Sequence, residues 1–100
     1  MILVRQVFQV KYGHMNEVLA AMKAFTGSDT PFQGVRVLTD ISGNNFTLVM
    51  EMKAESVDAY MHAMQAMFQN PDQAGIGDAF DQYIESGSRE FYTIEFEAGS

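Results

Sequence analysis

The order in which two hydrophobic periodicities follow one another most constrains what this chain can fold into. Residues 2–10 alternate between two faces and are rich in β-branched and aromatic side chains, which is typical of a strand. A repeat with helical spacing then begins at Met15 and stops at Gly27. Its apolar stripe consists of Met15, Val18, Leu19, Met22 and Phe25.

The same two periodicities recur further along the chain. Strands are predicted over residues 33–40 and 45–52, and the turn cluster Ser42-Gly43-Asn44 joins them into a hairpin. Ser56 is a good N-cap for a second helix, which ends by Asn70-Pro71. The apolar stripe of this helix consists of Val57, Tyr60, Met61, Met64 and Phe68.

A shorter helix over residues 78–85 and a last strand from Arg89 to about Phe96 complete the pattern. Phe80, Tyr83 and Ile84 are expected to face inward from the short helix. The order β-α-β-β-α-(α)-β predicts an α+β fold of the ferredoxin-like type. It has a four-stranded antiparallel sheet with the helices on one face. The 100 residues are enough for one such domain, spanning 1–100.

Composition excludes several classes of function. Six Lys and Arg against thirteen Asp and Glu give a net charge of −7, which argues against a nucleic-acid partner. No apolar run approaches the roughly 20 residues that span a bilayer, so we expect no membrane segment. The absence of Cys removes disulfide scaffolds, thiol nucleophiles and zinc–thiolate sites. The first ten residues lack a signal-peptide pattern, so we expect a cytoplasmic protein.

The face of the sheet that the helices leave uncovered needs an explanation. The helices should cover the more apolar row, formed by Ile2, Val4, Phe8, Val10, Val35, Val37, Ile41, Phe46, Leu48, Met50 and Met52. The other face then carries Leu3, Arg5, Val7, Gln9, Arg36, Leu38, Asn45, Thr47, Val49 and Glu51. For the last strand the pattern leaves the two faces undecided.

A fully solvated sheet face is normally more polar than this one. We therefore expect a homodimer that packs two such faces together, with a monomer as the alternative. The expected interface consists of Arg5, Val7, Arg36, Leu38, Val49 and Glu51. Its charged members would pair across strands, and the alternative is that they line a ligand cavity.

Gln6 interrupts the apolar row that faces the helices. A buried amide must form a hydrogen bond or it costs about 1–3 kcal/mol. One reading is a Gln bonded to the backbone or to Tyr60 or Tyr83; the other is a polar anchor in a small cleft. In the second reading Gln6, Tyr60 and Tyr83 are the candidate ligand-binding residues.

Two histidines are candidates for acid–base chemistry. His14 follows Gly13 at the first strand-to-helix turn, where an imidazole could act as a base, and no neighbouring carboxylate is expected to orient it. His62 falls on the helix side opposite the apolar stripe, beside Ala59, Ala63 and Ala66, a strip we expect to be a poor pocket wall. In each case a surface or turn residue is the alternative. The pattern predicts no metal site and no cofactor.

With these elements in place, the chain resembles the dimeric α/β-barrel superfamily, especially its small antibiotic-biosynthesis-monooxygenase-like and NIPSNAP-like members. The resemblance rests on residues 7–13 running into the helix from His14, on the hairpin residues 34–38, and on the second-helix opening at residues 55–60. It implies a homodimer with a barrel-like interface and a small-molecule cleft between sheet and helices. Haem-degrading members use an Asn, a Trp and a His; here Gln6 and His62 stand near two of these positions, and the chain has no Trp.

The sequence therefore supports two hypotheses. The first is a small dimeric α/β-barrel protein that binds a small molecule without a defined catalytic constellation. The alternative is a cofactor-independent, monooxygenase-like enzyme acting on a small aromatic or polyketide-like compound, so whether the chain is an enzyme stays open. In the enzyme, Gln6, Tyr60 and Tyr83 would position the substrate and His14 or His62 would move protons.

Overall fold

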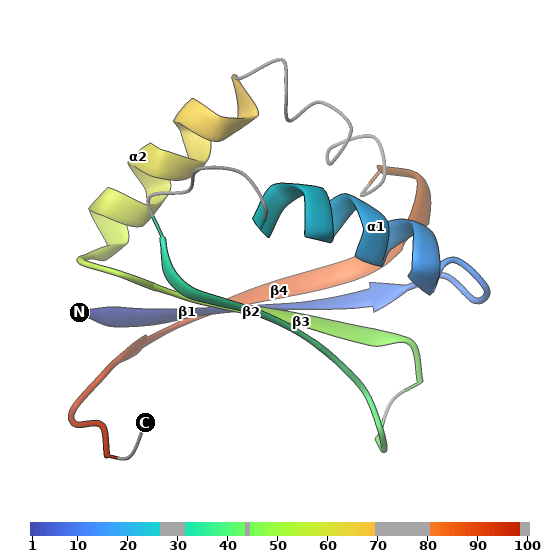
Figure 1. Cartoon of the computed structure of the whole chain (residues 1–100), viewed down its shortest axis with the longest axis horizontal. Helices are drawn as coiled ribbons and strands as arrows, with labels where there is room; N and C mark the ends of the chain where they lie inside the picture. Colours follow the sequence, from blue (N-terminus) through green and yellow to red (C-terminus); the bar gives the residue numbers. More distant parts are fainter. Residues whose placement is uncertain (27–31, 44, 70–80, 99–100) are drawn as a thin grey trace.

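In the part of the chain that the structure describes, a four-stranded antiparallel sheet carries two helices on one face and leaves the other face uncovered (Figure 1). The computed structural model describes residues 1–26, 32–43, 45–69 and 81–98. The elements are β1 (Ile2–Val10), α1 (Met15–Thr26), β2 (Gln33–Thr39), β3 (Thr47–Ala54), α2 (Val57–Phe68) and β4 (Ile84–Thr93). The strand order β2-β3-β1-β4 is that of the predicted ferredoxin-like fold.

The core lies between the sheet and the helices. Its fully buried side chains are Val4, Val10, Val18, Met22, Leu48, Met52 and Tyr60. Each aliphatic side chain of this kind contributes about 1.5–3 kcal/mol by leaving water. The row predicted to face the helices does so on β1 and β3, because Val4, Leu48 and Met52 all belong to it.

Two turns explain where the first elements begin and end. Gly13 has a φ of 82°, which an L side chain rarely adopts, and this residue reverses the chain between β1 and α1. The amide of His14 then donates to the carbonyl of Lys11 over 3.1 Å. At α2, the hydroxyl of Ser56 accepts a hydrogen bond from the amide of Ala59 over 3.1 Å, so the predicted N-cap is confirmed.

The β2–β3 hairpin differs in detail from the prediction. Ile41, expected on the helix-facing row, lies beyond the end of β2 and is fully exposed. The carboxylate of Asp40 accepts a hydrogen bond from the amide of Thr47, which closes the turn before Ile41 can join the sheet. Phe46 has a φ of 60°, so β3 begins at Thr47 rather than at residue 45.

Helix α2 is rotated relative to the predicted stripe. Val57 and Met61, expected to face the core, are more than two-fifths exposed, whereas Tyr60 is fully buried and Ala63 and Met64 pack against the core. Tyr60, which accepts a hydrogen bond from Gln6 of β1, lies on the buried side of the helix. The side chains of Phe25 and Phe68, also predicted to face the core, lie outside the described part of the chain.

The last strand begins earlier than predicted. Of the expected short helix, residues 78–80 lie outside the described residues, residues 81–83 form a helical turn, and β4 begins at Ile84 instead of Arg89. Residues 86–88 are Ser-Gly-Ser, whose small side chains give no apolar alternation, yet they pair with β1. The predicted helix end at residue 85 and strand start at Arg89 are therefore wrong.

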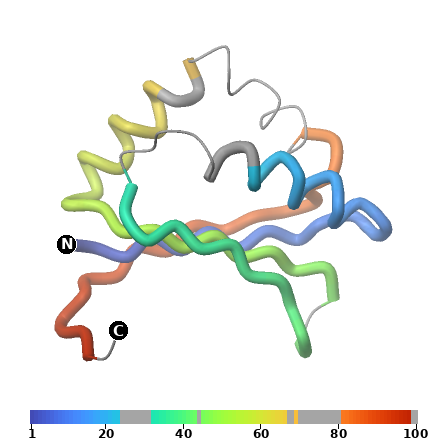
Figure 2. The backbone as a smooth tube through the Cα atoms, in the orientation of Figure 1, coloured from blue at the N-terminus to red at the C-terminus, as the bar shows by residue number. Residues whose placement is uncertain are grey.

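The backbone trace shows the chain leaving the sheet after β4 and turning beneath its uncovered face (Figure 2). The amide of Ile94 donates to the carbonyl of Met1 over 3.3 Å. Farther along, the Nζ of Lys53 lies 2.7 Å from the Oε2 of Glu97. No helix in residues 1–26, 32–43, 45–69 and 81–98 has the length and apolarity that a membrane crossing requires.

Candidate functional site

A buried amide and a buried phenol meet in the layer between the sheet and α2. The side chain of Gln6 projects from the middle of β1 toward α2, and only 4% of the residue is exposed. Its Nε2 donates a hydrogen bond to the hydroxyl of Tyr60, which is fully buried. The pairing of Gln6 with Tyr60, one of the sequence-based alternatives, is therefore present.

An arginine and two aromatic rings surround this pair. Arg89 pairs with Gln6 in the β1–β4 ladder, and its guanidinium carbon lies 5.3 Å from the centroid of the Tyr60 ring. The Nη1 of Arg89 also lies 3.6 Å from the Sδ of Met61. The rings of Phe32 and Phe91 have their centroids 5.5 Å and 5.6 Å from that of Tyr60. We call Gln6, Tyr60 and Arg89 the polar triad.

The electrostatics of the polar triad keep the phenol protonated. Burial raises the pKa of Tyr60 above its ordinary value, and the nearby Arg89 and the hydrogen bond from Gln6 oppose this rise. A neutral phenol that already accepts from an amide still has its own O–H to donate. The triad thus combines an uncharged hydrogen-bond donor with a positive charge.

Arg89 was not among the residues that the sequence singled out. The faces of the last strand stayed undecided in the sequence, because each of its two rows contains both apolar and polar side chains. One row consists of Phe91, Thr93 and Glu95, the other of Tyr92, Ile94 and Phe96. The β1–β4 register settles the matter: Val4 pairs with Phe91 and Gln6 with Arg89. The residues around Arg89 carry no hydrophobic alternation that assigns its face, so this register was needed to place Arg89 beside Gln6.

Tyr83 does not join Gln6 and Tyr60. The carbonyl of Tyr83 accepts from the amide of Lys11, so this residue lies past the end of β1. That position is roughly 15 Å from Gln6 at the usual rise of a strand. The ring of Tyr83 instead stacks on the imidazole of His14, with centroids 4.5 Å apart and an interplanar angle of 16°.

His14 has a carboxylate neighbour that the sequence analysis did not expect. Its Nδ1 lies 3.6 Å from the Oε1 of Glu17, one turn along α1. This distance is too long for a hydrogen bond, and Nδ1 is buried without a hydrogen-bond partner among the described residues. His14, Glu17 and Tyr83 therefore form a second titratable cluster, at the opposite end of β1 from its N-terminus.

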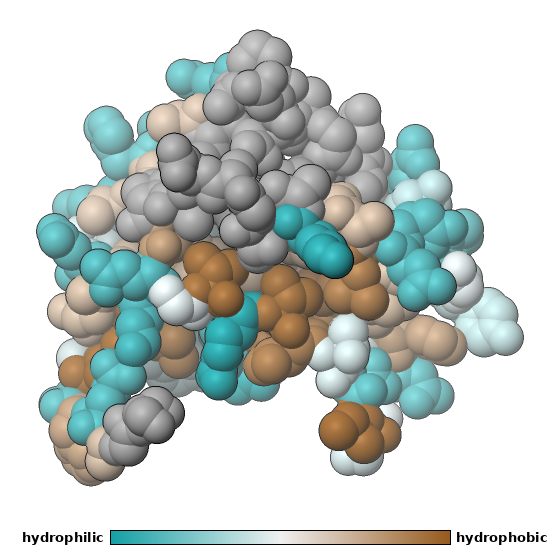
Figure 3. Space-filling view, in the orientation of Figure 1, coloured by the Kyte–Doolittle hydropathy of each residue, from teal (hydrophilic) through white to brown (hydrophobic). Residues whose placement is uncertain are grey.

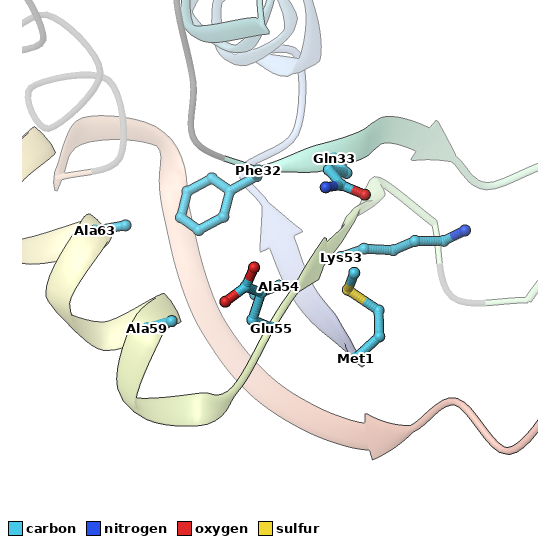
Figure 4. Close-up of a pocket in the computed structure, with 8 residues that line it drawn as sticks. All are labelled: Met1, Phe32, Gln33, Lys53, Ala54, Glu55, Ala59 and Ala63. Carbon is cyan, nitrogen blue, oxygen red and sulfur yellow. The ribbon is translucent and has the colours of Figure 1, made fainter.

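The outer side of α2 carries His62, which is exposed, as the helical geometry predicts. The alanine strip beside it behaves differently from the prediction. Ala59 and Ala63 line a pocket of about 150 Å³ at the edge of the helix–sheet layer, shown in Figure 4. The rotation of α2 brings these alanines over the sheet. Phe32 and Ala54 form apolar parts of this wall, and Glu55 supplies a carboxylate.

On the uncovered face, four charged residues form one row across all four strands. Arg36 of β2 pairs with Glu51 of β3, Glu51 with Arg5 of β1, and Arg5 with Glu90 of β4. We call this alternating row the charged row. Arg36 donates a hydrogen bond to Glu51, and the Nε of Arg5 lies 4.0 Å from Glu51 and 3.9 Å from Glu90.

An apolar row runs beside the charged row. Leu38, Val49 and Val7 pair across β2, β3 and β1, two residues along each strand. Val49 is 9% exposed within a single chain, whereas Leu38 is 39% exposed. In space-filling form the lower surface is concave between the segment that follows β4, at lower left, and the end of the β2–β3 hairpin, at lower right (Figure 3).

A groove of about 460 Å³ opens on this same face. It is lined by Leu3, Gly34, Val35, Arg36, Glu51, Lys53, Ile94 and Glu97.

As for metals, residues 1–26, 32–43, 45–69 and 81–98 contain no group of three His, Asp or Glu side chains placed to hold an ion.

Comparison with known proteins identifies the fold. The sequence matches no protein-family model and no curated protein. Among solved structures, an uncharacterized NIPSNAP domain protein from Burkholderia xenovorans superposes with a TM-score of 0.79 at 13% identity, over 100% of both chains. The chain thus has the ferredoxin-like α+β fold of the NIPSNAP and antibiotic-biosynthesis-monooxygenase-like proteins, as the resemblance in its sequence implied.

Two further solved structures share this fold. A proposed antibiotic biosynthesis monooxygenase from Nitrosomonas europaea has a TM-score of 0.72 at 10% identity, covering 96% of this chain and 100% of the other. A protein from Bacteroides fragilis NCTC 9343, described as dimeric and of ferredoxin-like fold, has a TM-score of 0.65 at 14% identity, covering 91% and 94% of the two chains. At these identities the likeness concerns the fold alone.

Proposed function

We propose that this chain forms a cytoplasmic homodimer that binds a small molecule at the polar triad. The observation that carries the proposal is the burial of Gln6 and Tyr60 together in the helix–sheet layer. An aliphatic pair would fill this space without the desolvation cost of an amide and a hydroxyl.

Support for the homodimer comes from the uncovered face. Leu38, Val7 and Leu3 lie in rows that neither α1 nor α2 covers, and Leu38 is well exposed. Two such faces packed together would remove these side chains from water. The described dimer of ferredoxin-like fold from Bacteroides fragilis is consistent with such an assembly.

The chemistry of the triad indicates the class of ligand. The phenol of Tyr60 is an uncharged donor, Arg89 is a cation, and the rings of Phe32 and Phe91 supply apolar surface beside them. A flat aromatic compound with a carboxylate or another acceptor group complements all three features. Arg89 is exposed, so a ligand approaching from solvent meets the cation first.

Salicylate is a suitable probe for this site. We expect that titration of ¹⁵N-labelled protein with salicylate shifts the side-chain amide signal of Gln6. Tyr60→Phe and Arg89→Gln should each weaken binding about tenfold or more, because each removes a hydrogen-bonded or charged contact. Tyr12→Phe is the matched control, since its ring is exposed near Phe46. Equal affinity of all these variants would refute the site.

The cluster of His14, Tyr83 and Glu17 favours a second candidate, the monooxygenase-like enzyme. An imidazole stacked on a phenol and 3.6 Å from a carboxylate can accept a proton from a phenolic substrate. In this candidate His14 rather than the exposed His62 moves the proton. Oxygen uptake with dithranol as the probe tests it: His14→Gln should abolish uptake above the rate without protein, and His62→Gln should not. No uptake by the unaltered protein would reject this candidate.

A further inference from the structure

The charged row on the uncovered face has a symmetry of its own. Read across the sheet from β2 to β4, its charges are positive, negative, positive and negative, at Arg36, Glu51, Arg5 and Glu90. Reading the row in the opposite direction exchanges every sign. Such a surface is electrostatically complementary to a second copy whose strand order is reversed.

A two-fold axis parallel to the strands turns the row in this way. Such a rotation keeps every residue at its height along the strands and reverses the strand order, so that β2 lies over the partner's β4 and β3 over the partner's β1. Arg36 then faces Glu90 of the partner subunit, and Arg5 faces Glu51 of the partner subunit. The two-fold axis repeats each of these two contacts, so the row makes four contacts across the interface, and all four join opposite charges.

A two-fold axis across the strands gives the opposite result. It keeps the strand order, so each strand lies over its own copy, and a row on the axis faces itself. Arg36 would then face Arg36 of the partner subunit, and Glu90 would face Glu90 of the partner subunit. Like charges placed together in this way cost free energy.

We propose that the charged row fixes the orientation of the homodimer, with the two-fold axis parallel to the strands. The proposal rests on the homodimer proposed above and names the partner as a second copy of this chain. The apolar row of Leu38, Val49 and Val7 supplies burial in either orientation, so it does not select one. The charges select the orientation, because they match in one arrangement and clash in the other.

Positions 36 and 90 lie on opposite edges of the sheet, which makes a charge-reversal cycle decisive. Within one chain two strands separate them, roughly 14 Å at the usual strand spacing. The effects of the two substitutions on the free energy of unfolding of one chain should therefore add. Across the proposed interface the two positions face each other, so the effects of the two substitutions on the free energy of dimerisation should not add.

The experiment is sedimentation equilibrium of the unaltered protein, Arg36→Glu, Glu90→Arg and the double variant. Each single change places like charges together twice in the dimer, and should raise the dimer dissociation constant about tenfold or more. The double variant restores opposite charges and should return within about threefold of the unaltered protein. An equimolar mixture of the two single variants should also dimerise, because its two edge contacts both join Glu to Arg.

Two results would overturn the orientation while leaving the dimer in place. The first is a double variant that loses as much dimerisation free energy as the two single variants together. That result would mean that positions 36 and 90 do not meet across the interface. Single variants as tightly dimeric as the unaltered protein would indicate the axis across the strands. An unaltered protein that stays monomeric at every concentration would instead overturn the homodimer itself. Circular dichroism of each variant checks that the fold is retained.

Discussion

Gly87 of β4 lies opposite Phe8 of β1, and a Cβ atom at position 87 would come within 2.8 Å of the Phe8 ring. This contact explains why a glycine stands inside a strand. The ring of Phe8 lies over the hydrogen of Gly87, in space that any other residue would fill. The pairing also anchors the early part of β4, where the neighbouring serines contribute little packing.

Gly87→Ala should therefore destabilise the protein by about 1–3 kcal/mol, because the ring of Phe8 must move to admit the methyl group. Urea denaturation measures the change. In the double variant Phe8→Leu with Gly87→Ala, the cost of the added methyl group should be smaller, since the leucine leaves room. A single Gly87→Ala variant as stable as the parent would show that the strands do not have this register.

The Gln6–Tyr60 hydrogen bond predicts a pattern of non-additive substitutions. Tyr60→Phe leaves the Gln6 amide buried without its acceptor, and Gln6→Leu leaves the hydroxyl of Tyr60 without its donor; each should cost about 1–3 kcal/mol. The double variant removes both polar groups, so it should cost less than the sum of the two. Additive losses in urea denaturation would mean that the two groups are not bonded in solution.

The raised pKa of Tyr60 predicts a loss of stability at high pH. In the unfolded chain the phenol ionises near pH 10.0, whereas burial raises its pKa in the folded chain, where it holds its proton to higher pH. The stabilisation is present below pH 10 and is lost as the pH rises through the folded pKa. The stability advantage over Tyr60→Phe should therefore shrink above pH 10, and an advantage independent of pH would contradict the burial of the phenol.

Leu48 and Leu38 test which face of the sheet is which. They lie on β3 and β2, and Leu48 is fully buried in the core whereas Leu38 is on the uncovered face. Leu48→Asp should unfold the protein, because it places a charge in the core. Leu38→Asp should keep the helical circular dichroism signal and weaken the dimer. The reverse pair of outcomes would mean that the two faces are exchanged.

The fold was predictable because its strongest signals are local. Val4, Leu48 and Met52 follow the period of two that a half-buried strand imposes, and the Ser56 N-cap marks the start of α2. The predictions for β4 and α2 were wrong where tertiary contacts determine the structure. The ring of Phe8 explains a glycine in β4, and α2 packs Tyr60, Ala63 and Met64 on the sheet and leaves the more apolar Val57 and Met61 exposed.

The candidate site was predictable only in part, for a related reason. Gln6 stands out as an amide in an apolar row, and Tyr60 is a natural partner for it. Arg89 and Glu90 were missed because the faces of β4 depend on its register with β1, which spans more than 80 residues of sequence. Tyr83 resembles Tyr60 as a phenol in the sequence, but Tyr83 lies past the end of β1, whereas Tyr60 bonds Gln6 in the middle of that strand.

Native mass spectrometry of the freshly purified protein tests the central claim most directly, because it reports the assembly and any bound compound together. The homodimer predicts a principal species near twice 11.2 kDa, and ligand binding at the polar triad predicts an added discrete mass of a small molecule. A spectrum dominated by the bare 11.2 kDa chain would contradict the account.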